Sequence, residues 1–273
     1  MIVPEGSVRQ GGKCPDSFLK GMIRGRDNGG IMLNKIFACA LVVTSVAVAS
    51  AGADVKEDVL AATKKLAGSE NYSWTTSSEN AQGVMPGGGE GKTQRDGLTM
   101  LKLGARTGTM TTIFFKDGKG AYQSADGTWH ATGADAGAGV ESGDGRMITS
   151  MVASYQPPAT QAQNLAQQAQ DLHKSEDDGS FAGTLSTDDA KALVQRRVVR
   201  GAGGPVEVQD AKAAVKFWAK DGVLSKFQIH MEGKLNANGQ ERPIDRTTTV
   251  EIKDVGTTSI DLPEEAKAKI TGS

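Results

Sequence analysis

Residues Val215–Leu235 read VKFWAKDGVLSKFQIHMEGKL, and Arg246–Val255 read RTTTVEIKDV. After the Asp221-Gly222 pair, apolar side chains recur at alternate positions: Val223, Phe227, Ile229, Met231 and Leu235. The residues between them are polar: Lys226, Gln228, His230, Glu232 and Lys234. A period of two is typical of a strand with one buried face and one wet face. Since Asp-Gly between two such runs is a strong hairpin signal, the stretch predicts a long antiparallel hairpin.

Two registers of this hairpin are open. A two-residue type I′ loop made of the Asp-Gly pair alone pairs Lys220 with Val223 and sets Phe217 on the polar face. A three-residue loop pairs Ala219 with Val223 and returns Phe217 to the apolar face. Because a slip of one residue turns every side chain over, the buried face selects the register. We therefore expect the three-residue loop, with a bulge at Gly222.

The remaining residues predict one α+β domain at 54–273. Asp-Gly pairs at 96–97, 117–118, 126–127, 144–145, 178–179 and 221–222 favour antiparallel hairpins. We expect strands at 71–79, 93–103, 109–116, 120–124, 128–132 and 180–186, with a loop at 83–91. Helices are expected at 54–67, 146–155, 160–174, 187–197 and after Pro263. The predicted architecture is a large antiparallel sheet with helices packed against one face.

Residues 32–53 have the organisation of a secretory signal peptide. Lys35 supplies a basic start, residues 36–48 form an apolar core, and small residues at 49–53 offer a cleavage site. The apolar run is shorter than the ~20 residues of a transmembrane helix, the alternative interpretation. Cys39 lies inside the core and not after the cleavage site, so lipidation is not expected. We predict export to the periplasm or the extracellular space, with no transmembrane segment in the mature chain.

Residues 1–31 are polar, rich in glycine and without periodicity. Because Met32 begins the signal peptide with ordinary spacing, we interpret 1–31 as a non-native extension from an upstream start, or else as a long disordered leader. Removing residues 1–53 removes six Lys/Arg and three Asp/Glu, which leaves 25 basic and 29 acidic residues and a net charge of −4. This balance, without a basic stripe interleaved with aromatics, argues against a nucleic-acid partner.

No catalytic constellation stands out in the sequence, and we expect no enzyme, cofactor or metal. Both cysteines fall before residue 54, and the three histidines, at 130, 173 and 230, lack metal-ligand spacing. The run GGGEGKT at 87–93 resembles a phosphate loop, but the required first glycine is Pro86, and a strand pattern follows where a helix is needed. Arg196, Arg197 and Arg200 form a basic cluster, interpreted as a helix C-terminus rather than an anion site.

A set of large apolar side chains is the candidate face for a hydrophobic ligand. It comprises Trp74, Phe114, Trp129, Met147, Met151, Phe217, Phe227, Ile229 and Met231. The same residues could instead form an ordinary packed core. The chain has only 13 aromatic residues, which are few to fill the concave face of a large sheet.

Two segments carry a resemblance to a known superfamily. KFWAKDGVLSKFQIHMEG (216–233) and TTTVEIKDVGTTSIDLPEEA (247–266) are similar to the LolA/LolB and LppX/LprG group of bacterial envelope lipid and lipoprotein carriers. The resemblance implies a curved half-barrel whose concave apolar face, covered by helices, holds an acyl chain. It also implies that helices 146–155 and 160–174 act as a lid. It assigns no residue a role.

Two functions follow as hypotheses. The first is an exported protein that binds or carries a lipid, a lipoprotein acyl chain or another hydrophobic molecule. The second is a non-enzymatic structural or interaction domain of the same fold, with a filled core and an envelope protein as partner.

Overall fold

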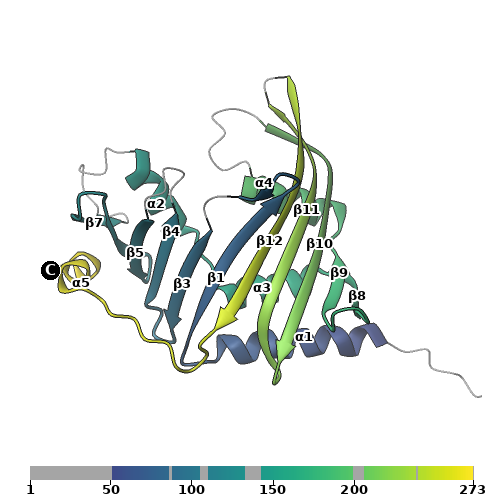
Figure 1. The fold of residues 1–273 in the computed structure, drawn as a ribbon, viewed down its shortest axis with the longest axis horizontal. Helices are drawn as coiled ribbons and strands as arrows, with labels where there is room; N and C mark the ends of the chain where they lie inside the picture. Colours follow the sequence, from purple (N-terminus) through teal and green to yellow (C-terminus); the bar gives the residue numbers. More distant parts are fainter. Residues whose placement is uncertain are drawn as a thin grey trace, which may run out of the picture. The chain divides into compact units, whose positions relative to one another are not determined.

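The computed structural model describes residues 51–85, 88–104, 110–132, 143–198, 206–237 and 239–272 (Figure 1). The predicted extension at 1–31, most of the predicted signal peptide and Arg200 lie outside these residues. The described part forms one antiparallel sheet and five helices.

Twelve described strands make up the sheet. Eleven follow the order β7-β6-β5-β4-β3-β1-β12-β11-β10-β9-β8, and β2 pairs with β1. Their bounds are β1 (Asn71–Asn80), β2 (Gly83–Val84), β3 (Gly89–Gln94), β4 (Thr99–Gly104), β5 (Met110–Lys116), β6 (Lys119–Gln123), β7 (Trp129–Thr132), β8 (Gln170–Lys174), β9 (Phe181–Thr184), β10 (Val206–Lys220), β11 (Val223–Ala237) and β12 (Gln240–Lys253). The sheet curves without closing, with β7 and β8 at its two edges (Figure 1). The predicted α+β half-barrel is confirmed.

Helices cover both faces of the sheet unequally. They are α1 (Ala51–Ala67), α2 (Gly143–Ala153), α3 (Pro158–Gln168), α4 (Thr187–Val198) and α5 (Glu264–Thr271). The first four pack on one face, which we call the helical face; α1, α3 and α4 lie behind β10–β12 in Figure 1. The helix α5 packs on the opposite face against β5, β6 and β7, a departure from the predicted arrangement.

The reason for the departure lies in β5. Its residues Ile113, Phe114 and Phe115 are consecutive, and all three are buried. Ile113 and Phe115 join the core under the helical face, whereas Phe114 joins a small cluster with Ala266 and Ile270 of α5. Since successive side chains of a strand point to opposite faces, this strand needs apolar cover on both.

The hairpin β10–β11 has a different register from the predicted one. Lys220 pairs with Val223 across a two-residue turn, so the predicted three-residue loop and its bulge at Gly222 are wrong. The register instead shifts at Ser225, whose hydroxyl donates to the Trp218 carbonyl at 3.0 Å. The extra residue turns the side chains beyond it back to the predicted face. Phe217 there pairs with Phe227, and both are buried.

Three other predicted segments differ from the structure. The expected strand 93–103 is two strands, β3 and β4, separated by a turn at 95–98, and the expected loop 83–91 contains β2 and the start of β3. The expected helix 160–174 ends at Gln168 and continues as β8. Ala169 has an extended ψ of 133° and Asp171 a left-handed φ of 50°, and pairing of β8 with β9 replaces the helical hydrogen bonds. Leu172 of β8 is buried.

Candidate functional site

The helical face of β9–β12, here the C-terminal half of the sheet, is closed. Phe217, Phe227, Ile229 and Met231 are 0–1% exposed there. The helix α1 packs against β11, and α4 packs against β10. None of the four side chains lines a cavity found among the described residues. The four side chains are buried between the sheet and these helices.

The other predicted ligand-face residues lie in three places. Trp74 is buried in the core of the helical face, and Met151 packs against that core. Phe114 and Trp129 lie on the opposite face with α5, their ring centroids 5.6 Å apart. Met147 is 65% exposed. Six of the nine residues therefore share the helical face, and three do not.

Two adjoining cavities lie on the helical face of β1 and β3–β5, here the N-terminal half of the sheet. They flank the strap, residues 154–157, which connects α2 to α3. The first has a volume of about 420 Å³ and reaches Tyr72, Phe115 and Val152. The second, of about 230 Å³, is lined by residues that include Trp74, Leu101, Leu103, Pro158 and Val250. Tyr155 of the strap lines both, so it stands between them.

Aromatic rings surround this position. The Tyr155 ring meets Phe115 edge-on at 4.8 Å between centroids and lies 6.4 Å from Trp74, which in turn lies 5.8 Å from Tyr72. The Tyr155 hydroxyl is buried and has no hydrogen-bond partner within the described part of the chain. Burial raises the pKa of Tyr155 well above its ordinary value and raises the pKa of Tyr72 to about 12. Both phenols are uncharged at neutral pH. The linings are mixed in character, because Arg95 and Asp117 also line the first cavity and Glu90 also lines the second.

The second cavity owes its space to small residues on β3. Gly91 pairs with Trp74, and a β-carbon at Gly91 would overlap the indole ring. Gly89 pairs with Thr76, and a β-carbon there would come within 3.0 Å of the Leu103 side chain. Glycine is needed at 91 because the indole lies directly on the backbone. The run GGGEGKT thus contributes to a strand that accommodates Trp74, not to a phosphate loop.

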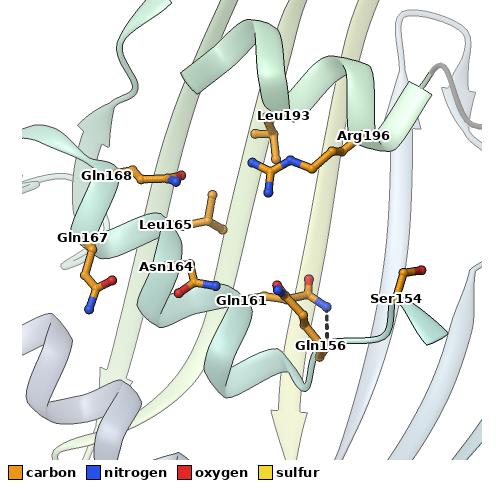
Figure 2. Close-up of a pocket in the computed structure, with 9 residues that line it drawn as sticks. All are labelled: Ser154, Gln156, Gln161, Asn164, Leu165, Gln167, Gln168, Leu193 and Arg196. Atoms are coloured by element: carbon orange, nitrogen blue, oxygen red, sulfur yellow. Dashed lines mark hydrogen bonds between the residues drawn. The ribbon is translucent and has the colours of Figure 1, made fainter. Parts of the chain in front are cut away.

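A third cavity, of about 360 Å³, lies between α3 and α4 (Figure 2). Its lining is mostly polar: Ser154, Gln156, Gln161, Asn164, Leu165, Gln167, Gln168, Leu193 and Arg196. Gln161 also lines the second cavity, so the two adjoin. The Gln161 side-chain amide donates to the Gln156 carbonyl at 2.7 Å, which ties α3 to the strap.

Sequence reasoning missed Leu101, Leu103, Phe115, Tyr155 and the amides of α3. Phe115 follows Phe114 in β5 and lies on the opposite face of the sheet. The sequence did not show that both faces of this strand are buried. For Tyr155 a signal was present, because it precedes Gln156-Pro157-Pro158, where the helix must break. The glycines at 89 and 91 were read only as a loop.

No group of three or more potential metal ligands occurs among the described residues. His130 stacks on Tyr122 at 5.2 Å and lies 3.0 Å from the Ser124 hydroxyl. His230 lies on the face of β11 opposite the helices, 3.0 Å from Glu232. Within the same residues, none of the helices combines the length and the apolar character needed to cross a bilayer.

No protein-family model matches the chain, and no curated protein matches its sequence. Among solved structures, LprF from Mycobacterium bovis matches with 11% identity and a TM-score of 0.44, over 78% of this chain and 97% of LprF. The Mycobacterium tuberculosis lipoprotein LppX matches with 11% identity and a TM-score of 0.44, over 77% of this chain and 98% of LppX. A DUF1329 family protein from Desulfovibrio piger has 8% identity and a TM-score of 0.32, over 80% and 98% of the two chains. LprF and LppX agree with the resemblance to the LolA/LolB and LppX/LprG group that the sequence predicted, but at these identities and TM-scores they carry no argument about family, role or ligand.

Proposed function

We propose that this protein binds a lipid, a lipoprotein acyl chain or another elongated hydrophobic molecule, with its apolar part in the first and second cavities. The observation that supports this most directly is the pair of cavities that meet at Tyr155. Aromatic and aliphatic side chains form a large part of each lining. The first cavity, of about 420 Å³, is in the range of small-molecule sites, and the second, of about 230 Å³, extends it. Water fills such apolar space poorly, so a hydrophobic chain gains free energy by entering it.

The proposed ligand face retains one residue of the sequence-based set, Trp74, and adds four that line the two cavities: Leu101, Leu103, Phe115 and Tyr155. Phe217, Phe227, Ile229 and Met231 then form the packed base that holds the sheet in its curved form. For a single chain to occupy both cavities, the Tyr155 ring of the strap would have to move, since it stands between them.

We further propose that the protein works outside the cytoplasm, as a single carrier domain at 54–273 without catalytic activity. The sequence of residues 32–53 supports this as a cleaved signal peptide. The helix α1 begins at Ala51, so a signal cut at 51 or 53 would leave nearly the whole helix in place. An envelope protein is the natural partner for loading or unloading.

A displacement assay with a fluorescent fatty acid tests the proposal. Leu103→Trp should fill the second cavity and lower affinity at least tenfold, whereas Leu235→Trp, a matched leucine on β11, should leave affinity unchanged. Native mass spectrometry of protein from its host should show a co-purified acyl compound. If the wild-type chain neither carries nor binds any acyl ligand, the carrier function is wrong.

The packed C-terminal half favours a second candidate, a non-enzymatic interaction domain with a filled core. Thermal unfolding with added lipid separates the two. A ligand at 100 times its Kd stabilises the folded state by about 2.7 kcal/mol. For a domain of this size that corresponds to a rise in Tm of roughly 5–10 °C. An interaction domain would show no such rise.

A further inference from the structure

The third cavity is more polar than the first two. The helix α3, which forms one wall, reads PATQAQNLAQQ and contains no Asp, Glu, Lys or Arg. Its polar side chains are amides and one hydroxyl, and Gln161, Asn164, Gln167 and Gln168 line the cavity. Side-chain amides donate N–H groups and accept at oxygen without carrying charge. This wall suits a polar group and gives it no ionic partner.

The ionic partner comes from the opposite wall. Arg196 is the one charged residue among the nine that line the cavity, and Figure 2 shows its side chain alongside α4, with the guanidinium next to Leu193. Its Nε donates to the Ala192 carbonyl at 3.3 Å, which fixes the side chain along its own helix. Among the described residues no carboxylate forms an ion pair with it. The guanidinium is thus available to an anion from outside the chain.

The polar cavity continues into the apolar site. Gln161 lines both the second and the third cavity, and the hydrogen bond that its side-chain amide donates to the Gln156 carbonyl lies at their border. Leu165 and Leu193 are buried at the cavity wall and give it an apolar floor. A molecule that spans the border would meet amides and a cation at one end and aromatic rings at the other.

We propose that the third cavity binds the anionic head group, a carboxylate or a phosphate, of an amphiphile whose chain occupies the apolar cavities. Arg196 is its ionic partner, and the α3 amides hold the remaining oxygens. This inference rests on the proposed function and specifies its ligand class. A guanidinium suits such a group because it can donate two parallel hydrogen bonds to two oxygens.

The test compares two ligands with the same chain and different head groups, palmitate and methyl palmitate, on the whole exported protein. Arg196→Gln should weaken palmitate binding about tenfold, the value of one charge-assisted hydrogen bond, and leave methyl palmitate unchanged. Arg196→Lys should recover part of the lost palmitate affinity, because lysine keeps the positive charge but cannot donate two parallel hydrogen bonds from a planar group. Lys191→Gln is the matched control, since it removes an exposed cation of α4 outside the cavity and should change neither affinity.

Monopalmitoyl phosphate, compared with palmitate, then distinguishes a phosphate from a carboxylate, and a neutral palmitoyl glycoside tests a sugar head group. Equal palmitate affinity in wild type and Arg196→Gln, with methyl palmitate still bound, would refute the head-group assignment alone. Tighter binding of the glycoside than of either anion would refute it too. Failure of the wild type to bind any of these ligands would refute the proposed function and this inference together.

Discussion

The two halves of the sheet share one face and one core, yet only one is hollow. In the C-terminal half, β10, β11 and β12 are 15, 15 and 14 residues long and place large apolar side chains under α1 and α4. In the N-terminal half, β3, β4 and β5 have six, six and seven residues. The long strands carry Phe217 and Phe227 as a direct pair. In the short strands the side chains of each cross-strand pair have a smaller combined volume.

Side-chain volume accounts for the difference. Along β1 and β3 the facing pairs on the helical side are Tyr72 with Thr93, Trp74 with Gly91, and Thr76 with Gly89. Each large ring therefore faces a small partner, and the last pair contains no large side chain. The strap covers this region with one large residue, Tyr155, so space remains on either side of its ring. Hollow and filled regions are thus encoded by the cross-strand partners rather than by the strand pattern.

The largest expected effect comes from truncating one phenylalanine in each half. Phe227→Ala should lower the free energy of unfolding by about 4–5 kcal/mol, the upper range for a buried Phe, because tight packing on all sides prevents collapse. Phe115→Ala should cost only about 2–3 kcal/mol, since its ring already borders a cavity and has fewer contacts to lose. Urea unfolding of both variants measures the difference. Equal costs would mean that the halves are packed alike.

The sequence predicted some features of this contrast between the two halves and not others. The period of two from Phe227 to Met231 correctly predicted a buried face, because alternation depends on the strand alone. The register of the same hairpin was mispredicted, because a bulge on either strand restores the apolar face equally well, and only the packed structure selects Ser225. Burial was therefore predictable where register was not.

The site was harder to predict than the fold. The alternation along one strand places Trp74 on the buried face. Whether its ring is packed or borders a cavity depends on its cross-strand partner Gly91, which is 17 positions away and was predicted to lie in a loop. Phe114 was assigned to the ligand face because β5 has apolar residues on both faces, and alternation cannot then decide which face is which. The amides of α3 gave no signal until Arg196 lay opposite them.

Gly91→Ala tests whether the N-terminal half has space to spare. The added methyl group overlaps the indole of Trp74, and overpacking a filled core costs about 1–3 kcal/mol. We expect a loss near 1 kcal/mol, because the ring can shift into the adjoining 230 Å³ cavity. The shift should change tryptophan fluorescence and weaken fatty-acid binding. A loss well above 3 kcal/mol with unchanged fluorescence would show that the cavity cannot receive the ring.

Tyr155→Phe should have a smaller effect of the opposite sign. The Tyr155 hydroxyl is buried without a partner among the described residues, so its removal abolishes a desolvation cost and should stabilise the fold by about 0.5–1 kcal/mol. Tyr72→Phe is the matched control. The backbone of Ala159 lowers the pKa of the Tyr72 hydroxyl, so this hydroxyl has a polar neighbour and its loss should destabilise. Thermal unfolding of both variants gives the two signs. Destabilisation by Tyr155→Phe would reveal a partner for its hydroxyl.

The smallest effect concerns a surface ion pair that joins the short strands. The Lys116 ammonium donates to Asp96 at 2.8 Å, and this bond, followed by the backbone N–H of Leu98, lowers the pKa of the Asp96 carboxyl. The pair connects the β3–β4 turn to the end of β5, next to the Thr99–Phe115 pair of β4 and β5.

A lowered folded-state pKa means that the unfolded chain takes up the proton first. The stability from Asp96 is therefore complete above about pH 4, the ordinary range of an aspartate, and is lost as the pH falls through the folded-state pKa. Asp96→Asn should lower the stability slightly at pH 7 and flatten its decline between about pH 5 and 3. Glu251→Gln on β12 removes the same charge from the C-terminal half, where the long strands need no such tie, and its acid unfolding curve should match the wild type. If both variants flatten the dependence of stability on pH equally, the Lys116–Asp96 ion pair makes no specific contribution to the stability of the N-terminal half.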